Sequence, residues 1–100
     1  MRQRRQGDTL TVFLEGELDH SKADSIRNEL DTMLSDRKVR HLILDLERLT
    51  FMDSSGIGVV LGRYNLLAKR GGTVSVKSPS ERVDKIFRLS GVYQIIEKIG

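Results

Sequence analysis

LILDLERLTFMDSSGIG, residues 42–58 of this 100-residue chain, decides the fold. Its first part, Leu42–Leu46, is a nearly continuous apolar run, which is typical of a parallel strand covered on both faces. A short connection follows, and then Ser54 and Ser55 open an amphipathic helix. The unpaired N–H groups and the positive dipole end at a helix N-terminus favour an anion. A serine in this place can therefore carry or bind a phosphate.

The helix that starts at these serines is expected to run from about Ser55 to Lys69. Ser55 is its expected N-cap, with the hydroxyl accepting from a backbone N–H. The pair Gly71–Gly72 suits a left-handed C-cap beyond the last turn. The helical spacing predicts a core face with these residues: Ile57, Val60, Leu61, Tyr64, Leu67 and Ala68.

The opposite face of this helix is small and apolar where charged side chains are usual. It is predicted to contain Ser55, Gly58, Val59, Gly62, Asn65 and Leu66. Each of the two interior glycines costs about 0.5–1 kcal/mol of helix stability relative to alanine. Tight packing inside the domain and docking of a partner both explain such a face, and the pattern alone favours them equally.

Elements on both sides of this stretch alternate between strand and helix periodicity. In chain order the pattern predicts a strand over 9–15, a helix from an N-cap at Ser21 to about residue 34, a strand over 73–76, a helix capped by Ser78 and ended by Gly91, and a last helical turn over 92–99. No internal repeat is present. We therefore predict one α/β domain over residues 1–100, with a small, largely parallel sheet of about four strands and helices packed against it.

Composition narrows the classes of function. The chain has no cysteine, so a disulfide framework, a thiolate nucleophile and a zinc–thiolate cluster are excluded. No apolar run is as long as a membrane span, and the first residues do not form a signal peptide. We therefore expect a cytoplasmic protein without a metal site.

The formal charge of +3 comes from Arg2, Arg4 and Arg5, since the rest of the chain has 14 basic and 14 acidic side chains. Residues 1–6 are interpreted as a basic arm or an edge strand. A solvated chain end is the favoured reading of this charge. Direct binding of nucleic acid is the less favoured alternative, and it would depend on these three arginines.

Two polar connections are predicted at the carboxyl edge of the sheet, where functional groups gather in such folds. One is Gly16–Ser21 and the other is Leu49–Gly56. Because right-handed crossovers place them on neighbouring strands, we expect Glu17, Asp19 and Asp53 to lie near Ser54.

Enzymatic motifs do not fit these residues. Met52 and Asp53 stand where the first glycine of a nucleophile elbow would fall, and no phosphate-binding glycine loop is present. His20 as a base oriented by Asp19 is a weak possibility because the two are adjacent in sequence. A non-catalytic protein is therefore predicted.

The segments Gly16–His20, Arg40–Glu47 and Phe51–Tyr64 resemble the STAS domain of bacterial anti-sigma-factor antagonists, and are most like its sporulation members. The likeness covers about Thr9 to Ile96, and the Asp-Ser-Ser-Gly start of the helix is its specific part. Residues 1–6 depart from the family's apolar first strand.

The resemblance implies a partner switch. In this family the unphosphorylated antagonist binds an anti-sigma factor that is also a serine kinase, and this frees the sigma factor. Phosphorylation, here expected on Ser54, releases the antagonist until a metal-dependent serine phosphatase resets it. No cofactor of its own is implied. The expected partner-binding residues are Glu17, Asp19, Asp53, Ser55, Gly56, Gly58, Val59, Gly62, Arg63 and Leu66.

The sequence leaves two further alternatives for the function open. A different partner-switching circuit, such as general stress control, would use the same residues. A STAS module that works without a kinase would show no phosphate transfer.

Overall fold

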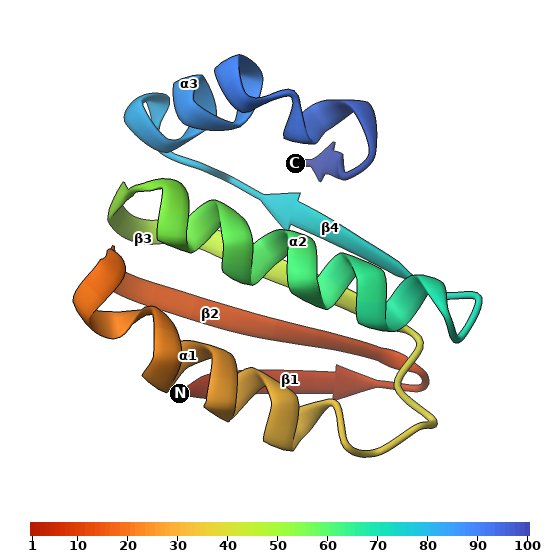
Figure 1. Cartoon of the computed structure of the whole chain (residues 1–100). Coiled ribbons are helices and arrows are strands. Elements are labelled where there is room, and N and C mark those ends of the chain that lie inside the picture. Colours follow the sequence, from red (N-terminus) through yellow and green to blue (C-terminus); the bar gives the residue numbers. More distant parts are fainter.

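Five strands form one sheet in the computed structural model, which describes residues 1–100 (Figure 1). The elements in chain order are β1 (Arg2–Gln6), β2 (Thr9–Leu18), α1 (His20–Met33), β3 (His41–Met52), α2 (Ser54–Ala68), β4 (Thr73–Lys77), α3 (Glu81–Ser90), the 3-10 turn η1 (Val92–Gln94) and β5 (Glu97–Ile99). The predicted α/β domain is confirmed.

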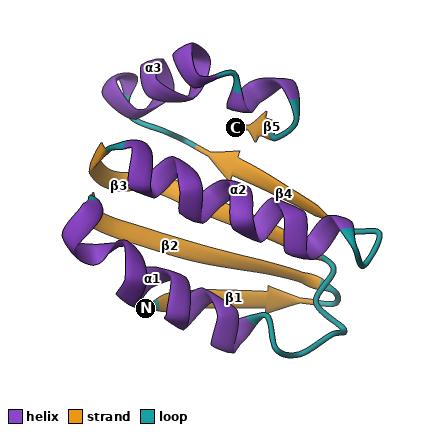
Figure 2. Cartoon of the chain, in the orientation of Figure 1, coloured by secondary structure: helices purple, strands orange, loops and turns teal.

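The spatial order of the strands is the same as their order in the chain. β1 and β2 form an antiparallel hairpin, and every other neighbouring pair is parallel. The hairpin turn uses Gly7 with φ of +61°, a conformation that glycine adopts without a Cβ clash. Helices α1 and α2 cross in front of the sheet, while α3 packs against β3 (Figure 2). The largely parallel sheet is thus confirmed.

β3 is much longer than the predicted Leu42–Leu46, since it continues to Met52. Two register shifts against β2 interrupt its alternation, one after Asp45 and one after Leu49. Each shift adds one residue to β3, so the core-facing positions after Leu46 are three apart instead of two. Much of the predicted connection over 49–56 is therefore strand, and only Asp53 lies between β3 and α2.

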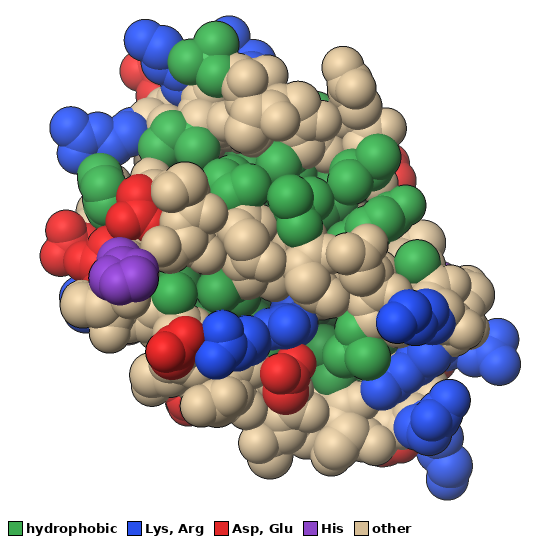
Figure 3. All heavy atoms as spheres, in the orientation of Figure 1, with side chains coloured by type: hydrophobic (Ala, Val, Ile, Leu, Met, Phe, Trp, Pro, Cys, Tyr) green, Lys and Arg blue, Asp and Glu red, His purple; other side chains and the backbone are tan.

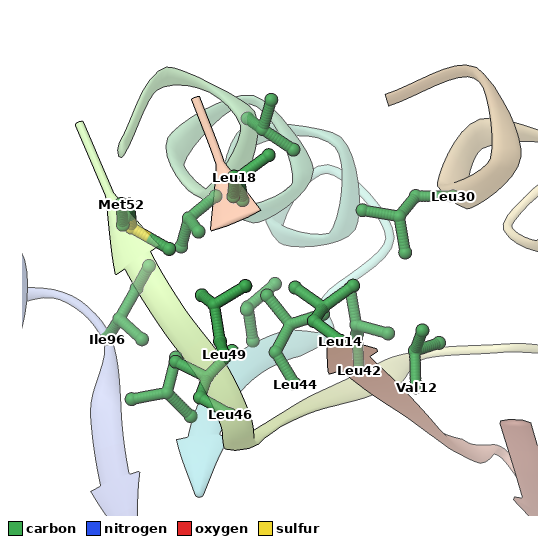
Figure 4. Close-up of a cluster of buried hydrophobic side chains, with 14 of the residues drawn as sticks. Val12, Leu14, Leu18, Leu30, Leu42, Leu44, Leu46, Leu49, Met52 and Ile96 are labelled. Carbon is green, nitrogen blue, oxygen red and sulfur yellow. The ribbon is translucent and has the colours of Figure 1, made fainter. Parts of the chain in front are cut away.

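The core lies between the sheet and the helices (Figure 4). It contains 22 buried hydrophobic residues, and the predicted inward face of β2 belongs to it, because Leu10, Val12 and Leu14 are buried. In Figure 4 the side chains of Leu44, Leu46 and Leu49 project from β3 into this cluster. Most of the apolar side chains of β3 are therefore buried on the face of the sheet that the helices cover.

The C-terminal segment differs from the prediction. Residues 92–99 form a short 3-10 turn and the edge strand β5 instead of one helical turn. Helix α3 is capped by Ser80, whose hydroxyl accepts from the Val83 N–H at 3.3 Å, and not by Ser78. The predicted end at Gly91 is correct, with φ of +78°.

A small polar cluster joins α3, η1 and β5. The Asp84 carboxylate of α3 accepts from the Tyr93 hydroxyl at 2.5 Å and from the Lys98 ammonium at 3.1 Å. Arg88 lies 3.4 Å from its other oxygen. The hydrogen bond from Tyr93 and then that from Lys98 hold the pKa of Asp84 below its usual value.

Candidate functional site

Asp53 joins the starts of the two helices at the carboxyl edge of the sheet. It caps α2, because its Oδ1 accepts from the N–H groups of Ser55 at 2.9 Å and Gly56 at 3.3 Å. Its Oδ2 accepts from the His20 N–H of α1 at 3.1 Å. One carboxylate therefore satisfies free N–H groups of both helices. The expectation that Ser55 is the N-cap is wrong, since the carboxylate of Asp53, two residues earlier, accepts from the first N–H groups of the helix.

Asp19 has the same position at the start of α1. Its carboxylate accepts from the Lys22 N–H at 3.2 Å and from the Ser21 hydroxyl at 2.7 Å. The hydrogen bond from Ser21 is the largest cause that lowers the pKa of Asp19. The predicted N-cap Ser21 is therefore not the cap; its hydroxyl donates to the carboxylate of Asp19, which is the cap.

The two serines at the start of α2 differ in their surroundings. Ser54 is exposed and its hydroxyl makes no hydrogen bond within the chain. Ser55 is half-buried, and its Oγ lies 3.3 Å from Nδ1 of His20. Ser54 is therefore the hydroxyl that an external enzyme can reach.

Gly56 allows the first turn of α2 to approach the strands. A Cβ built on it would lie 2.5 Å from Met52 Cγ and 2.8 Å from the backbone oxygen of Leu18. Both contacts are much shorter than real Cβ contacts. Any larger residue would push the start of α2 away from β2 and β3.

The predicted outer face of α2 is only partly correct. Val59 is buried in the core and does not belong to the surface, because α1 packs over it. Leu66 of this face is half-buried, and Arg63, which was expected as a partner-binding residue, is also buried. A Cβ on Gly58 or Gly62 would meet nothing within 4 Å, so these two glycines do not serve close packing inside the domain.

Two hollows lie one after the other along the boundary between α1 and α2, and we call them together the α1–α2 trough. The first, of about 340 Å³, lies beside the helix starts and is lined by His20, Ala23, Asp24, Arg27, Ser55, Gly58 and Val59. The second, of about 430 Å³, is lined by Asp31, Leu34, Ser35, Gly62, Arg63, Asn65, Leu66, Lys69 and Arg70. Figure 3 shows basic and acidic side chains gathered along this boundary.

The structure brings together some predicted site residues and separates others. Asp53, Ser54, Ser55 and Gly56 lie in consecutive positions, and Asp53 reaches the start of α1 directly after Asp19. Glu17 is exposed at the end of β2 and forms an ion pair with Lys22 at 3.7 Å.

Arg63 and Leu66 lie further along α2, in the second hollow of the trough. His20 was not predicted as a site residue. Its contacts come from the neighbouring strand ends, and an adjacent Asp-His pair gives no sign of them.

The basic N-terminal residues are an edge strand in this structure. Arg2 stacks on Phe13 at 4.3 Å from the ring centroid, and Arg4 lies 6.0 Å from the same ring. Arg5 donates to Asp36 at 2.8 Å. These cations thus lie on or against β2 and the α1–β3 connection.

No group of three or more His, Asp or Glu side chains is arranged to hold a metal ion. No helix is long and apolar enough to cross a membrane.

Comparison with known proteins gives consistent matches. The family model described as the STAS domain matches residues 1–100. The anti-sigma F factor antagonist of Paenibacillus polymyxa is 41% identical over 87 residues, which are 87% of this chain and 74% of the relative.

Among solved structures, the fold is similar to that of the anti-sigma factor antagonist SpoIIAA in its unphosphorylated form, with a TM-score of 0.85 and 35% identity. That match covers 99% of this chain and 87% of SpoIIAA. The phosphorylated form of the Bacillus protein SpoIIAA matches with a TM-score of 0.76 and 34% identity, over 99% of this chain and 90% of the other.

Proposed function

This chain belongs to the STAS domain family, and from that premise we propose that it is a non-catalytic anti-sigma-factor antagonist controlled by phosphorylation of Ser54. In its unphosphorylated form it binds an anti-sigma factor with serine kinase activity and thereby releases a sigma factor. A metal-dependent serine phosphatase restores this form. The kinase supplies ATP, and the antagonist needs no cofactor of its own.

The observation that carries the proposal is the position of Ser54. Its hydroxyl is exposed and free at the first position of α2, directly after the Asp53 cap. The 41% identical relative is named an anti-sigma F factor antagonist, and a phosphorylated SpoIIAA exists at 34% identity. These relatives support both the antagonist role and the use of a phosphate.

The local electrostatics suit a switch. A phosphate on Ser54 adds about −1.5 to −2 charges and three acceptor oxygens. The N–H groups of Ser55 and Gly56 already donate to Asp53, so they are not free to neutralise it. The positive end of the α2 dipole offsets only a part of the new charge. The phosphate therefore leaves the fold intact and presents a desolvation cost to any partner that covers it.

We propose a binding surface that combines the helix starts with the trough. Its residues are Glu17, Asp19, Asp53, Ser55, Gly56, Gly58, Gly62, Arg63 and Leu66. Val59 contributes only as the buried wall of the first hollow. We propose sporulation as the setting and the cytoplasm as the location.

Phosphate transfer tests the proposal directly. The full chain is incubated with the anti-sigma F factor of Paenibacillus polymyxa, ATP and Mg²⁺, and the modified residue is located by mass spectrometry. We expect one phosphate on Ser54 in the wild type and in Ser55→Ala, and none in Ser54→Ala. Binding of the anti-sigma factor should weaken about 100-fold or more after phosphorylation, which corresponds to about 2.7 kcal/mol.

Ser55→Ala is the matched control, since it removes the neighbouring hydroxyl and leaves the Asp53 cap in place. Phosphate on Ser55, or undiminished incorporation into Ser54→Ala, would show that the assignment is wrong.

A further inference from the structure

Arg63 is a buried cation whose hydrogen-bonding groups are unused. Its side chain is 10% exposed, and Arg63 and Asp45 are the only polar residues among the 25 buried ones. Asp31 of α1 is its single ionic partner, with 3.2 Å between Nε and Oδ1. This contact does not have hydrogen-bond geometry, because Nε, Nη1 and Oδ1 all lack a partner. The ion pair in the free protein is therefore incomplete.

Burial makes this arrangement unfavourable for the charge. A guanidinium has five N–H donors, and buried donors are normally all paired. Burial lowers the pKa of Arg63, Asp31 acts in the opposite direction, and Arg27 adds repulsion. Nε and Nη1 are sealed from solvent, which leaves Nη2 as the nitrogen that can meet a ligand from outside.

The second hollow of the trough gives such a ligand access. Gly62 leaves its floor open, and Arg63 lies in its wall. The lining has three cations and one anion, Asp31, so it attracts negative charge. The Arg70 guanidinium is fixed there by the backbone oxygens of Leu34, Asp36 and Val39, and has no acidic partner.

We propose that this hollow receives a carboxylate side chain of the anti-sigma factor, which accepts from the Arg63 guanidinium through Nη2. The inference rests on the proposed function and names the chemistry of one subsite. Charge complementarity supports an acidic ligand, and half-buried Leu66 in the same lining offers an apolar contact beside it.

Continuity of the surface supports a protein as its source. Ser54 and Arg63 are nine residues apart on α2, which is about 14 Å of helix and within one interface of ordinary size.

The test is the affinity of the full chain for the anti-sigma F factor of Paenibacillus polymyxa. Arg63→Met replaces the charge by an apolar side chain of similar length, and we expect it to weaken binding about 30-fold or more. The melting temperature should stay the same or rise, because an incompletely paired buried charge is removed. Arg82→Met, at an exposed arginine of α3, is the matched control and should leave both values unchanged.

Double-mutant cycles identify the carboxylate of the anti-sigma factor that binds to Arg63. Surface Glu and Asp residues of the anti-sigma factor are changed one at a time to Gln and Asn. One of these changes should weaken binding to the wild type about tenfold and have no further effect on binding to Arg63→Met. Should Arg63→Met not fold, Arg63→Lys is used, which keeps the charge and loses the planar fork.

The outcomes separate the two proposals. Wild-type affinity in Arg63→Met, or no acidic change coupled to Arg63, overturns the carboxylate subsite and leaves the antagonist role standing. A wild type that does not bind the anti-sigma factor overturns the proposed function, and the subsite with it.

Discussion

At the scale of single residues, Asp53 determines the geometry of the switch region. Its two oxygens accept from N–H groups of both helices, so the starts of α1 and α2 are held against each other. An amide in this place would present an NH₂ group to one of those N–H donors. Only a carboxylate satisfies both helices, and it does so directly before the residue proposed to be phosphorylated.

Gly56 offers a sharp test of this geometry. In Gly56→Ala the new Cβ would meet the backbone oxygen of Leu18 at 2.8 Å, and backbone cannot move aside cheaply. We expect the free energy of unfolding to fall by about 1–3 kcal/mol, measured by urea denaturation. Gly58→Ala is the control, since open space surrounds it, and it should gain about 0.5–1 kcal/mol from helix propensity. Equal stabilities of the two variants would contradict the close approach.

At the scale of elements, α2 has two different flanks. Val60 and Leu67 are fully buried in the core, while Gly58 and Gly62 line the hollows of the trough. Because nothing in the domain occupies the space above these glycines, their helix-propensity cost has no compensation inside the free protein. We infer that contacts with a bound partner compensate for this cost.

Gly62→Leu separates recognition from packing on this helix. The leucine has open space and better helix propensity, so we expect unchanged or higher thermal stability. Its side chain would fill the floor of the second hollow, and binding of the anti-sigma factor should weaken about tenfold or more. Calorimetric melting and a binding titration give the two values. Lys85→Leu, on an exposed position of α3, is the control for the added apolar surface.

If the Gly62→Leu variant were unstable but still bound the anti-sigma factor at low temperature, the role of Gly62 in recognition would be contradicted. The glycines would then serve the domain and not the partner.

Much of this arrangement is predictable from sequence, because strand and helix periodicities are local. The inward face of β2, the position of α2 and the end of α3 at Gly91 follow from spacing and turn chemistry. The second half of β3 is not predictable in this way. Its two bulges change the apolar spacing from two to three, which is closer to a helical pattern.

The site is predictable in its centre and not at its edges. Asp53 and the serines are adjacent in sequence, so their common position needs no tertiary information. The hydrogen bond to His20 and the burial of Arg63 depend on how α1 packs on α2. Arginine side chains are usually exposed, so Arg63 in the sequence gives no sign that a neighbouring helix covers it.

At the scale of the whole molecule, the last strand depends on a charged cluster. β5 has only three residues, and the Asp84 carboxylate links α3 to Tyr93 and Lys98 on both sides of the turn into β5. The folded-state pKa of Asp84 is lowered from 3.8, so ionised Asp84 stabilises the fold. That contribution is complete above the unfolded-state pKa and is lost as the pH falls through the folded-state pKa.

Asp84→Asn therefore has a pH-dependent effect. At pH 7 we expect the variant to be less stable than the wild type, because the neutral amide attracts Lys98 and Arg88 less strongly. The difference should begin to close as the pH falls below about 4, the unfolded-state pKa, and should disappear below the lower folded-state pKa, where the wild-type carboxyl is also neutral. Urea denaturation at a series of pH values measures it. Glu47→Gln, at an exposed site without an ion pair, should show no such difference, and a constant gap for Asp84→Asn would contradict the cluster's role.

The identical order of strands in space and in sequence has a consequence for how the chain reaches this fold. Each strand adds to the edge left by the strand made just before it, so no segment waits for one synthesised much later. The parallel pairings join residues 22 to 34 positions apart, so the loop-closure entropy of each step is lower than in a sheet whose neighbouring strands are distant in sequence. During translation β1, β2 and α1 can assemble first, and the proposed phosphorylation site forms only when β3 and α2 have left the ribosome. The proposed phosphorylation site can therefore form before β5 closes the far edge of the sheet.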